Sequence, residues 1–497
     1  MGVIRKESIR STIFSYIGIA IGFISQTFIY TNLLSSQIIG LIRVLQSFGG
    51  MQAEVSQLSI QTITGRFFPY FRNKDNGHHG FLTMALLFTT MGFIIVFLLI
   101  LIFKNQIISW YSEQSPLFVQ KYPYAFPIAL ALVYITVFES YLRMLYRIIY
   151  STIVKEIYIR LFALFAVLLY AFKVIGFEGF LVLFSATYAV AAFSMIVYLK
   201  IIGELYLKPD FSILTKSFWK EIRSYTVYTY ITILVQRGIL EIDKLILAAM
   251  IGLGAAGIYS VASLMATVIA MPINAIGNIS VSFISEAFKI NDMYKVREIY
   301  HKASLNQFIA SGLLFLLIWF NADNLFAFMP EEYQQGKWII LYIGISKLVD
   351  SFCLNSNTVI LLSKYYTFMV FSGTITLVFL IAANIYLINI MGITGAALAI
   401  LMSVVLHDAL KVGYTWYRFN IHPFNKNLFK AFAVFVFCFL VLSVIPQLFH
   451  PVIDIAFRLF LITVIYLVLT VLFRVSDDIS VFYKEVINRL LRIIKIK

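Results

Sequence analysis

Continuous apolar runs dominate the chain, and short connections rich in polar and basic residues separate them. A run of about 20 apolar residues is long enough to cross the hydrocarbon core of a bilayer as a helix. In lipid, such a run satisfies its backbone N–H and C=O groups only as a helix. The pattern therefore predicts an all-α polytopic membrane protein with fourteen spans, at about residues 10–34, 38–63, 81–103, 124–146, 153–172, 178–200, 224–249, 257–285, 304–326, 339–362, 366–388, 394–416, 430–449 and 454–473.

Composition agrees with lipid as the main solvent. Hydrophobic residues make up 61% of the 497 residues and charged residues only 13%, whereas a soluble domain carries roughly a quarter charged residues. The net charge of +15 does not indicate nucleic acid, because the basic residues lie in connections between apolar runs. The two cysteines lie inside apolar runs and the histidines share no metal-binding spacing, so no disulfide, metal or cofactor is predicted.

The distribution of Lys and Arg orients the helices, since these residues are in excess in cytoplasmic loops. With the N-terminus inside, the predicted cytoplasmic segments hold 28 of the 39 basic residues, the external segments 4 and the spans 7. Both termini are therefore expected to be cytoplasmic. No connection is large enough for a catalytic domain and no GxxxxGK[ST] phosphate loop occurs, so we expect a protein that is not an enzyme.

The second half of the chain restarts like the first, which indicates an internal repeat. Ser8-Ile9-Arg10-Ser11 opens the first span, and Glu221-Ile222-Arg223-Ser224 opens the seventh. Two parallel six-helix lobes with a cavity that opens alternately to each side are a known transporter plan. We expect a six-helix lobe over residues 1–202, a basic cytoplasmic linker over 203–223, a second six-helix lobe over 224–417, two extra helices within 418–473 and a basic amphipathic tail over 474–497.

Span two carries polar residues at helical spacing. They recur every three or four positions, which places them on one face of a helix: Arg43, Ser47, Gly50, Glu54, Gln57 and Gln61. A lumen-facing stripe that binds a polar substrate is one interpretation, and a stripe buried against a neighbouring helix is the other. Arg66, beyond the end of this span, is expected at the cytoplasmic mouth of such a lumen.

Several other spans contain charges, each of which costs about 2.5–3.5 kcal/mol at the centre of a lipid-exposed helix. In span seven, Arg237, Glu241 and Lys244 are spaced to pair along one face, while Asp243 projects elsewhere. These side chains either neutralise one another or line a substrate or gating site.

Two further pairs follow the same logic, with residues three apart: Lys347 with Asp350 in span ten, and Asp408 with Lys411 in span twelve. Each is a helix-internal ion pair or part of the lumen. Arg458 lies near the external end of span fourteen and can extend to the membrane surface, so it receives no role.

The chain resembles the polysaccharide transporter family, the O-antigen and capsule flippases of the multidrug/oligosaccharidyl-lipid/polysaccharide exporter superfamily. The resemblance covers essentially the whole chain. It rests on the fourteen spans, on GRFFPYFRNK (65–74) after span two, and on IDKLILAAMIGLGAAGIYSVASLM (242–265), which contains Asp243 and Gly257-Ile258-Tyr259. The stretch SSQIIG (35–40) departs from the family, in which many members carry an acidic residue or Tyr before the glycine.

The resemblance implies a flippase that moves a polyprenyl-diphosphate-linked oligosaccharide across a bacterial cytoplasmic membrane for surface polysaccharide synthesis, with membrane lipids and the glycan polymerase machinery as partners. Basic lumen side chains would hold the diphosphate, namely Arg43, Arg66, Arg237, Lys244, Lys347 and Lys411, and Glu54, Gln57 and Gln61 would contact the sugar. A coupling proton or sodium ion would bind among Glu241, Asp243, Asp350 and Asp408.

Other classes stay open on the sequence. A lipid II flippase and a drug or cation antiporter belong to the same superfamily. Twelve spans are usual for the antiporters, so spans thirteen and fourteen argue against them. A membrane glycan polymerase or ligase would be an enzyme, but such enzymes usually need a long external loop, and the longest one here is about 104–123.

Overall fold

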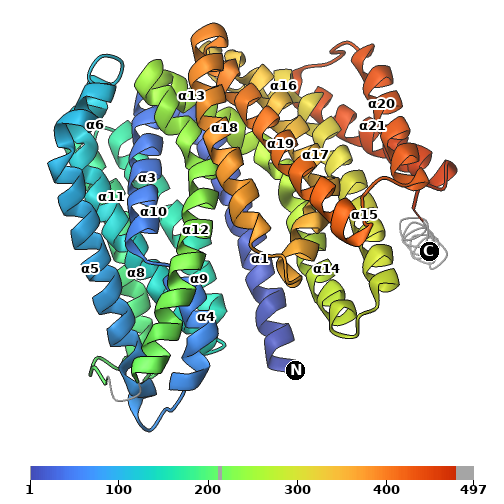
Figure 1. The fold of residues 1–497 in the computed structure, drawn as a ribbon. Helices are drawn as coiled ribbons and strands as arrows, with labels where there is room; N and C mark the ends of the chain where they lie inside the picture. The colour runs from blue at the N-terminus through green and yellow to red at the C-terminus, as the bar shows by residue number, and fades with distance from the viewer. Residues whose placement is uncertain (1, 211–214, 477–497) are drawn as a thin grey trace, which may run out of the picture. The chain divides into compact units, whose positions relative to one another are not determined.

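The computed structural model describes residues 2–210 and 215–476, and within those ranges the chain is helical and contains no strand. Inter-residue contacts divide the chain into two compact units, Met1–Val261 and Ala262–Lys497. Figure 1 shows the helices of both units in order along the chain. The predicted all-α class is therefore confirmed. The predicted amphipathic tail over 474–497 lies outside the described residues from 477 onward.

The first unit consists of long helices joined by short connections, and the central helix α3 packs against α5, α8 and α12. Its principal elements are α1 (Gly2–Ile24), η1 (Ser25–Ile29), α2 (Tyr30–Leu33), α3 (Ser36–Ser56), α4 (Ile60–Phe71), α5 (Phe81–Ile102), α6 (Lys104–Tyr111), α7 (Pro116–Lys121), α8 (Ala125–Met144), α9 (Ile148–Ile153), η4 (Val154–Tyr158), α10 (Ile159–Ala171), α11 (Phe177–Ile201) and α12 (Lys216–Met250). Helix α13 (Leu253–Thr267) crosses the division between the units.

The second unit centres on α17, which packs against α15 and α19. Its principal elements are α14 (Met271–Lys289), α15 (Met293–Trp319), α16 (Ala322–Phe326), α17 (Lys337–Leu362), α18 (Phe368–Met391), α19 (Ile393–Phe419), α20 (Lys426–Ser443) and α21 (Pro451–Leu472). Helices α20 and α21 supply Val434, Cys438 and Tyr466 to an apolar core that they share with Phe308 and Phe315 of α15. The extra pair of C-terminal helices is thus integral to this unit.

Each of the fourteen predicted spans coincides with a helix or a consecutive set of helices. Within the described ranges, 11 helices are long and apolar enough to cross a membrane by length and composition alone. The remaining predicted spans correspond to α3 with α4, to α9 through α10, and to α12. Charged residues lower the mean hydropathy of these three segments, and the break between α3 and α4 also shortens the first of them.

Helix ends follow local capping chemistry. The side chains of Ser35 and Thr215 accept hydrogen bonds from backbone N–H groups in the first turns of α3 and α12, at 3.4 and 3.2 Å. Asp292 caps α15 in the same way at 2.9 Å. Each oxygen satisfies one of the N–H groups that a helix start leaves without an internal partner, which fixes the position where the helix begins.

Span two is not one continuous helix, which corrects the prediction of an unbroken polar stripe. Leu58 and Ser59 adopt positive φ angles of 50° and 61°, so α3 ends at Ser56 and α4 begins at Ile60. The left-handed conformation changes the direction of the chain. Gln61 consequently lies on a different helix from Arg43 and is exposed.

Contacts place α12 with the first unit, because it packs along α3 and α4. The internal repeat instead predicts that this span belongs to the second lobe. Contact grouping and repeat symmetry are different properties, so the division into lobes over 1–202 and 224–417 stays a prediction.

Candidate functional site

Arg43 on α3 is a membrane-embedded cation held by neutral partners. Its Nη2 donates to Gln26 Oε1 at 2.5 Å, and its Nη1 donates to Gln46 Oε1 at 3.2 Å. Gln26 lies in η1, a π-helical turn of the kind that often occurs at functional positions. In the described part of the chain, no carboxylate oxygen lies within 4.0 Å of Arg43, and its Nε is buried without a hydrogen-bond partner. Arg43 therefore has no direct carboxylate partner, although Glu241 lies close enough to act on it electrostatically.

The charged triplet of α12 lies against the same face of α3. Glu241 pairs with Arg237 at 3.3 Å and with Lys244 at 2.9 Å, as the spacing predicts. The hydroxyl of Ser47 also donates to Glu241, at 2.7 Å. A Cβ atom at Gly50 would lie 2.4 Å from Arg237 Nη2, so the absence of a side chain there makes room for the guanidinium. Two cations share one carboxylate, and the triplet carries a net positive charge.

The remaining predicted residues of this region separate into two groups. Gln57 is buried at the C-terminal end of α3 and donates a hydrogen bond to Glu54 of the same helix, so both belong to the helix that contacts the triplet. Arg66 instead lies on the exposed part of α4, where it pairs with Glu221 at 2.9 Å and stacks over the Tyr225 ring at 4.5 Å. Arg43, Glu54, Arg237, Glu241 and Lys244 are thus brought together along α3 and α12, whereas Gln61 and Arg66 are not.

Asp243 points away from the triplet, as predicted. Its carboxylate is 3% exposed and accepts a hydrogen bond from the Tyr259 hydroxyl at 2.5 Å. The other carboxylate oxygen, Oδ1, is buried and has no hydrogen-bond partner in the structure. A buried carboxylate with a vacant acceptor position is suited to bind a proton or a small cation.

The second unit contains its own charged cluster. Asp408 and Lys411 of α19 form an ion pair at 2.8 Å, and both side chains are buried. Lys347 and Asp350 lie on α17, which packs against α19. Neither of these two forms an ion pair within 4.0 Å in the described ranges, so of the two interpretations of this pair, the helix-internal ion pair does not form. Each is oriented toward the buried pair closely enough to act on it electrostatically.

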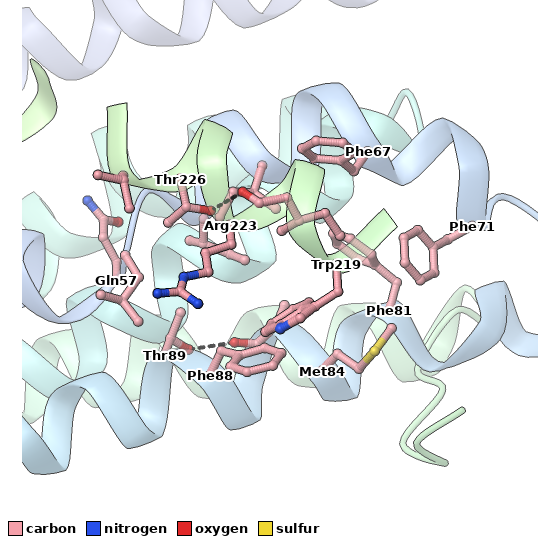
Figure 2. A pocket seen from close by; sticks show the side chains of 16 residues that line it. Gln57, Phe67, Phe71, Phe81, Met84, Phe88, Thr89, Trp219, Arg223 and Thr226 are labelled. Carbon is pink, nitrogen blue, oxygen red and sulfur yellow. Dashed lines mark hydrogen bonds between the residues drawn. The ribbon is translucent and has the colours of Figure 1, made fainter. Parts of the chain in front are cut away.

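An apolar pocket of about 240 Å³ lies between α4, α5 and α12 in the first unit. Figure 2 shows aromatic rings at one end of it and Arg223, Gln57 and Thr89 at the other. The Phe88 and Trp219 rings stack at a centroid distance of 5.4 Å. The sequence did not indicate this pocket, because α12 lies more than a hundred residues along the chain from the other two walls, α4 and α5.

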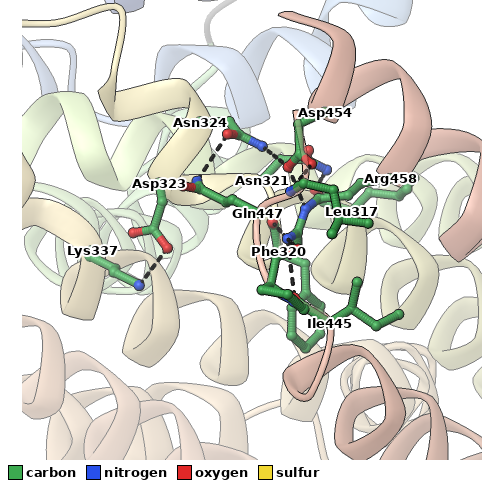
Figure 3. A network of polar contacts seen from close by, with 12 residues as sticks. Leu317, Phe320, Asn321, Asp323, Asn324, Lys337, Ile445, Gln447, Asp454 and Arg458 are labelled. Atoms are coloured by element: carbon green, nitrogen blue, oxygen red, sulfur yellow. Dashed lines mark hydrogen bonds and ion pairs between the residues drawn. The ribbon is translucent and has the colours of Figure 1, made fainter. Parts of the chain in front are cut away.

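A polar network near the start of α21 was also missed. Arg458 is buried and pairs with Asp454 at 2.6 Å, and it donates to the backbone oxygens of Phe320, Ile445 and Pro446 at 3.3, 3.2 and 2.8 Å (Figure 3). It therefore does not extend to the membrane surface. The spacing of Asp454 and Arg458 indicates a pair, but the carbonyl groups lie in other elements and leave no signal in the sequence.

Comparison with known proteins identifies the fold. No protein-family profile matches the chain, and no curated protein matches it by sequence. Among solved structures, the lipid II flippase MurJ in an inward closed conformation matches at 13% identity and a TM-score of 0.74, over 96% of this chain and 100% of MurJ. An inward-facing multidrug resistance MATE family transporter of the MOP superfamily matches at 12% identity and a TM-score of 0.65, over 83% of this chain and 98% of the transporter.

A third structure is a MOP superfamily transporter from Pyrococcus furiosus, described as having a binding pocket of reverse polarity. It matches at 13% identity and a TM-score of 0.57, over 84% of this chain and 96% of the other. The fold is therefore that of the MOP-superfamily transporters, which are multidrug/oligosaccharidyl-lipid/polysaccharide exporters. These neighbours are transporters rather than enzymes.

Proposed function

We propose that this protein is a flippase that moves polyprenyl-diphosphate-linked oligosaccharide units across a bacterial cytoplasmic membrane by alternating access. The transporter fold supports the general activity, and the full-length likeness to a lipid II flippase supports a lipid-linked cargo. Both termini are proposed to be cytoplasmic, as the distribution of Lys and Arg predicts.

The observation that carries the proposal is that, in the described ranges, Arg43 has no carboxylate within ion-pair distance. A guanidinium without a carboxylate partner is costly inside a membrane protein, so such residues usually mark a substrate or ion pathway. Gln26 and Gln46 orient the group but do not neutralise it. A diphosphate would supply the missing negative charge and accept charge-assisted hydrogen bonds. Arg237 and Lys244, which share the single carboxylate of Glu241, would add attraction from α12.

The acidic residues provide the proposed coupling site. Asp243, with its vacant buried oxygen, is the first candidate to carry a proton or sodium ion, and Asp350 and Asp408 are candidates in the second unit. Glu241 is a weaker candidate, because two cations and the Ser47 hydroxyl already occupy its oxygens. In the second unit, Lys347 is the first candidate to contact substrate, and Lys411 is a weaker candidate because Asp408 already pairs with it in a buried position.

A lipid II cargo is the second candidate, and the MurJ likeness is the observation that favours it. The charge at Arg43 would serve either cargo, since it recognises an anion and not a sugar. The sugar identity therefore has to come from the intermediate that accumulates in cells.

The test compares Arg43→Gln with Arg43→Lys in a host whose own copy is deleted. We expect the Gln variant to slow transport about ten- to a hundredfold, the equivalent of one hydrogen bond to a charged group, and the Lys variant to retain part of the rate. The control is Arg143→Gln, since Arg143 is exposed and pairs with Glu139 within its own helix at 3.2 Å. Mass spectrometry of lipid-linked intermediates gives the readout. Wild-type transport by a folded Arg43→Gln protein would remove Arg43 from the substrate site.

A further inference from the structure

The pocket between α4, α5 and α12 has a wall made mainly of carbon. The rings of Phe67, Phe71, Phe81, Phe88 and Trp219 line it, together with aliphatic side chains from the same helices. A dry apolar cavity of about 150 Å³ is already large enough to bind benzene, and this one measures about 240 Å³. Its size and surface therefore suit a segment of branched, unsaturated hydrocarbon.

Arg223 is the one cation among the residues that line the pocket. Figure 2 shows its guanidinium directed toward the end where Gln57 and Thr89 lie, away from Phe71 and Phe81. In the ranges that the structure describes, Arg223 makes no ion pair and no side-chain hydrogen bond. A cation that no acidic side chain neutralises, at one end of an apolar pocket, is complementary to an amphiphile with an anionic group.

The pocket adjoins the polar face of α3. Gln57 belongs to its lining and donates a hydrogen bond to Glu54, which lies on the same face of α3 as Arg43. An amphiphile in the pocket would therefore have its anionic end near the C-terminal end of α3, about 21 Å along the polar face of that helix from Arg43. An anionic phospholipid could also place its phosphate at Arg223, so it is the competitor that the test has to exclude.

We propose that this pocket binds the isoprenoid chain of the lipid carrier in a first bound state, with the carrier's phosphate at Arg223, before the diphosphate reaches Arg43. The inference rests on the proposed function and names the part of the protein that recognises the carrier and not the sugar. The isoprenoid chain enters the pocket from lipid and not from water, so its transfer into the pocket gains little hydrophobic free energy. Selection then depends on the charge of Arg223 and on the fit to the aromatic wall.

The direct test is photo-crosslinking of the full-length protein in lipid nanodiscs, with a benzophenone-tagged polyprenyl monophosphate as the probe. We expect labelled peptides from α4, α5 and α12, and competition by untagged polyprenyl phosphate but not by an equal amount of phosphatidylglycerol. Equal competition by phosphatidylglycerol would assign the pocket to ordinary phospholipid. Labelling confined to other helices would overturn the proposal.

Two variants make the test specific to the pocket. Arg223→Gln should lower labelling about tenfold, as the loss of one charge-assisted contact implies. Ala85→Phe should abolish labelling, because Ala85 lines the pocket. Ile94→Phe is the matched control on the same helix. Ile94 is exposed and lies on the face of α5 opposite the one that lines the pocket, so this change should leave labelling unchanged. Unchanged labelling in both pocket variants would contradict the proposal.

The outcomes separate this inference from the proposed function. If Arg43→Gln blocks transport while Arg223→Gln and Ala85→Phe transport and label like wild type, the pocket proposal fails and the flippase proposal stands. If the pocket labels as expected but deletion of the gene leaves no lipid-linked intermediate behind, the pocket proposal stands and the flippase proposal fails.

Discussion

Asp454 and Arg458 form an ion pair whose two side chains are 1% and 8% exposed. Asn324 donates to the same carboxylate at 2.7 Å, and Gln447 donates to Asn324 at 3.0 Å (Figure 3). The three backbone oxygens bound by Arg458 belong to the end of α15 and to the connection after α20. One arginine therefore ties α21 to the two elements beside it.

We predict that Asp454→Asn lowers the free energy of unfolding by about 3–5 kcal/mol, because it leaves a buried guanidinium without its counter-charge. The measurement is chemical denaturation in detergent micelles. Asp323→Asn is the control, because Asp323 and its partner Lys337 are 57% and 35% exposed, and such pairs contribute about 0–1 kcal/mol. Equal losses in the two variants would mean that burial does not set the strength of the Asp454–Arg458 pair.

At the residue scale, spacing along one helix indicated some charge pairs correctly and others not. The spacing of Arg237, Glu241 and Lys244 predicted their pairing, and the same rule predicted Asp408 with Lys411. It failed for Lys347 and Asp350, where correct spacing did not bring the charges together. Interactions between segments distant in sequence, such as Arg43 with Gln26 or Asp243 with Tyr259, require the fold.

Among the elements, α3 and α13 approach so closely that their backbones are in contact. A Cβ atom at Gly257 would lie 2.2 Å from the Ser36 oxygen, and one at Gly40 would lie 1.7 Å from the Leu253 oxygen. Small residues allow such approach between helices in membranes, where packing drives association. The two glycines therefore set the distance between these helices.

We predict that Gly257→Ala lowers the free energy of unfolding by about 1–3 kcal/mol, since overpacking forces the backbones apart. Gly413→Ala is the matched control, because Gly413 lies inside α19 with nothing within 4 Å of the added Cβ. That change should raise stability by about 0.5–1 kcal/mol, as alanine is the better helix former. Thermal unfolding in the same detergent compares them, and equal melting temperatures would contradict the close approach.

The helices themselves could be predicted from hydropathy, but the break within span two could not. The sequence around Leu58 and Ser59 contains neither proline nor glycine, so nothing in it indicates a positive φ angle. The break nevertheless removes Gln61 from the stripe and places Gln57 and Leu58 in the wall of the apolar pocket. Local sequence signals therefore located the spans and missed the feature that shapes the pocket.

At the scale of the whole molecule, the fold persists where sequence similarity is almost lost. The chain shares only 13% identity with MurJ, yet the two superpose over nearly their full lengths. A bilayer constrains each span to a long apolar helix, and many apolar residues satisfy that constraint equally well. Chemical specificity then rests on the few polar residues inside the spans, which is why Arg43 and the charged triplet of α12 carry the proposed function.

Deleting the gene tests the proposed transport most directly. Mass spectrometry would identify the polyprenyl-linked sugars that accumulate, and a membrane-impermeant sugar-modifying reagent would show which face they occupy. We predict accumulation of a single diphosphate-linked oligosaccharide unit on the cytoplasmic face, because that is the side from which a flippase takes its cargo. Accumulation on the external face, or no accumulation at all, would contradict the proposal that this protein flips lipid-linked oligosaccharides.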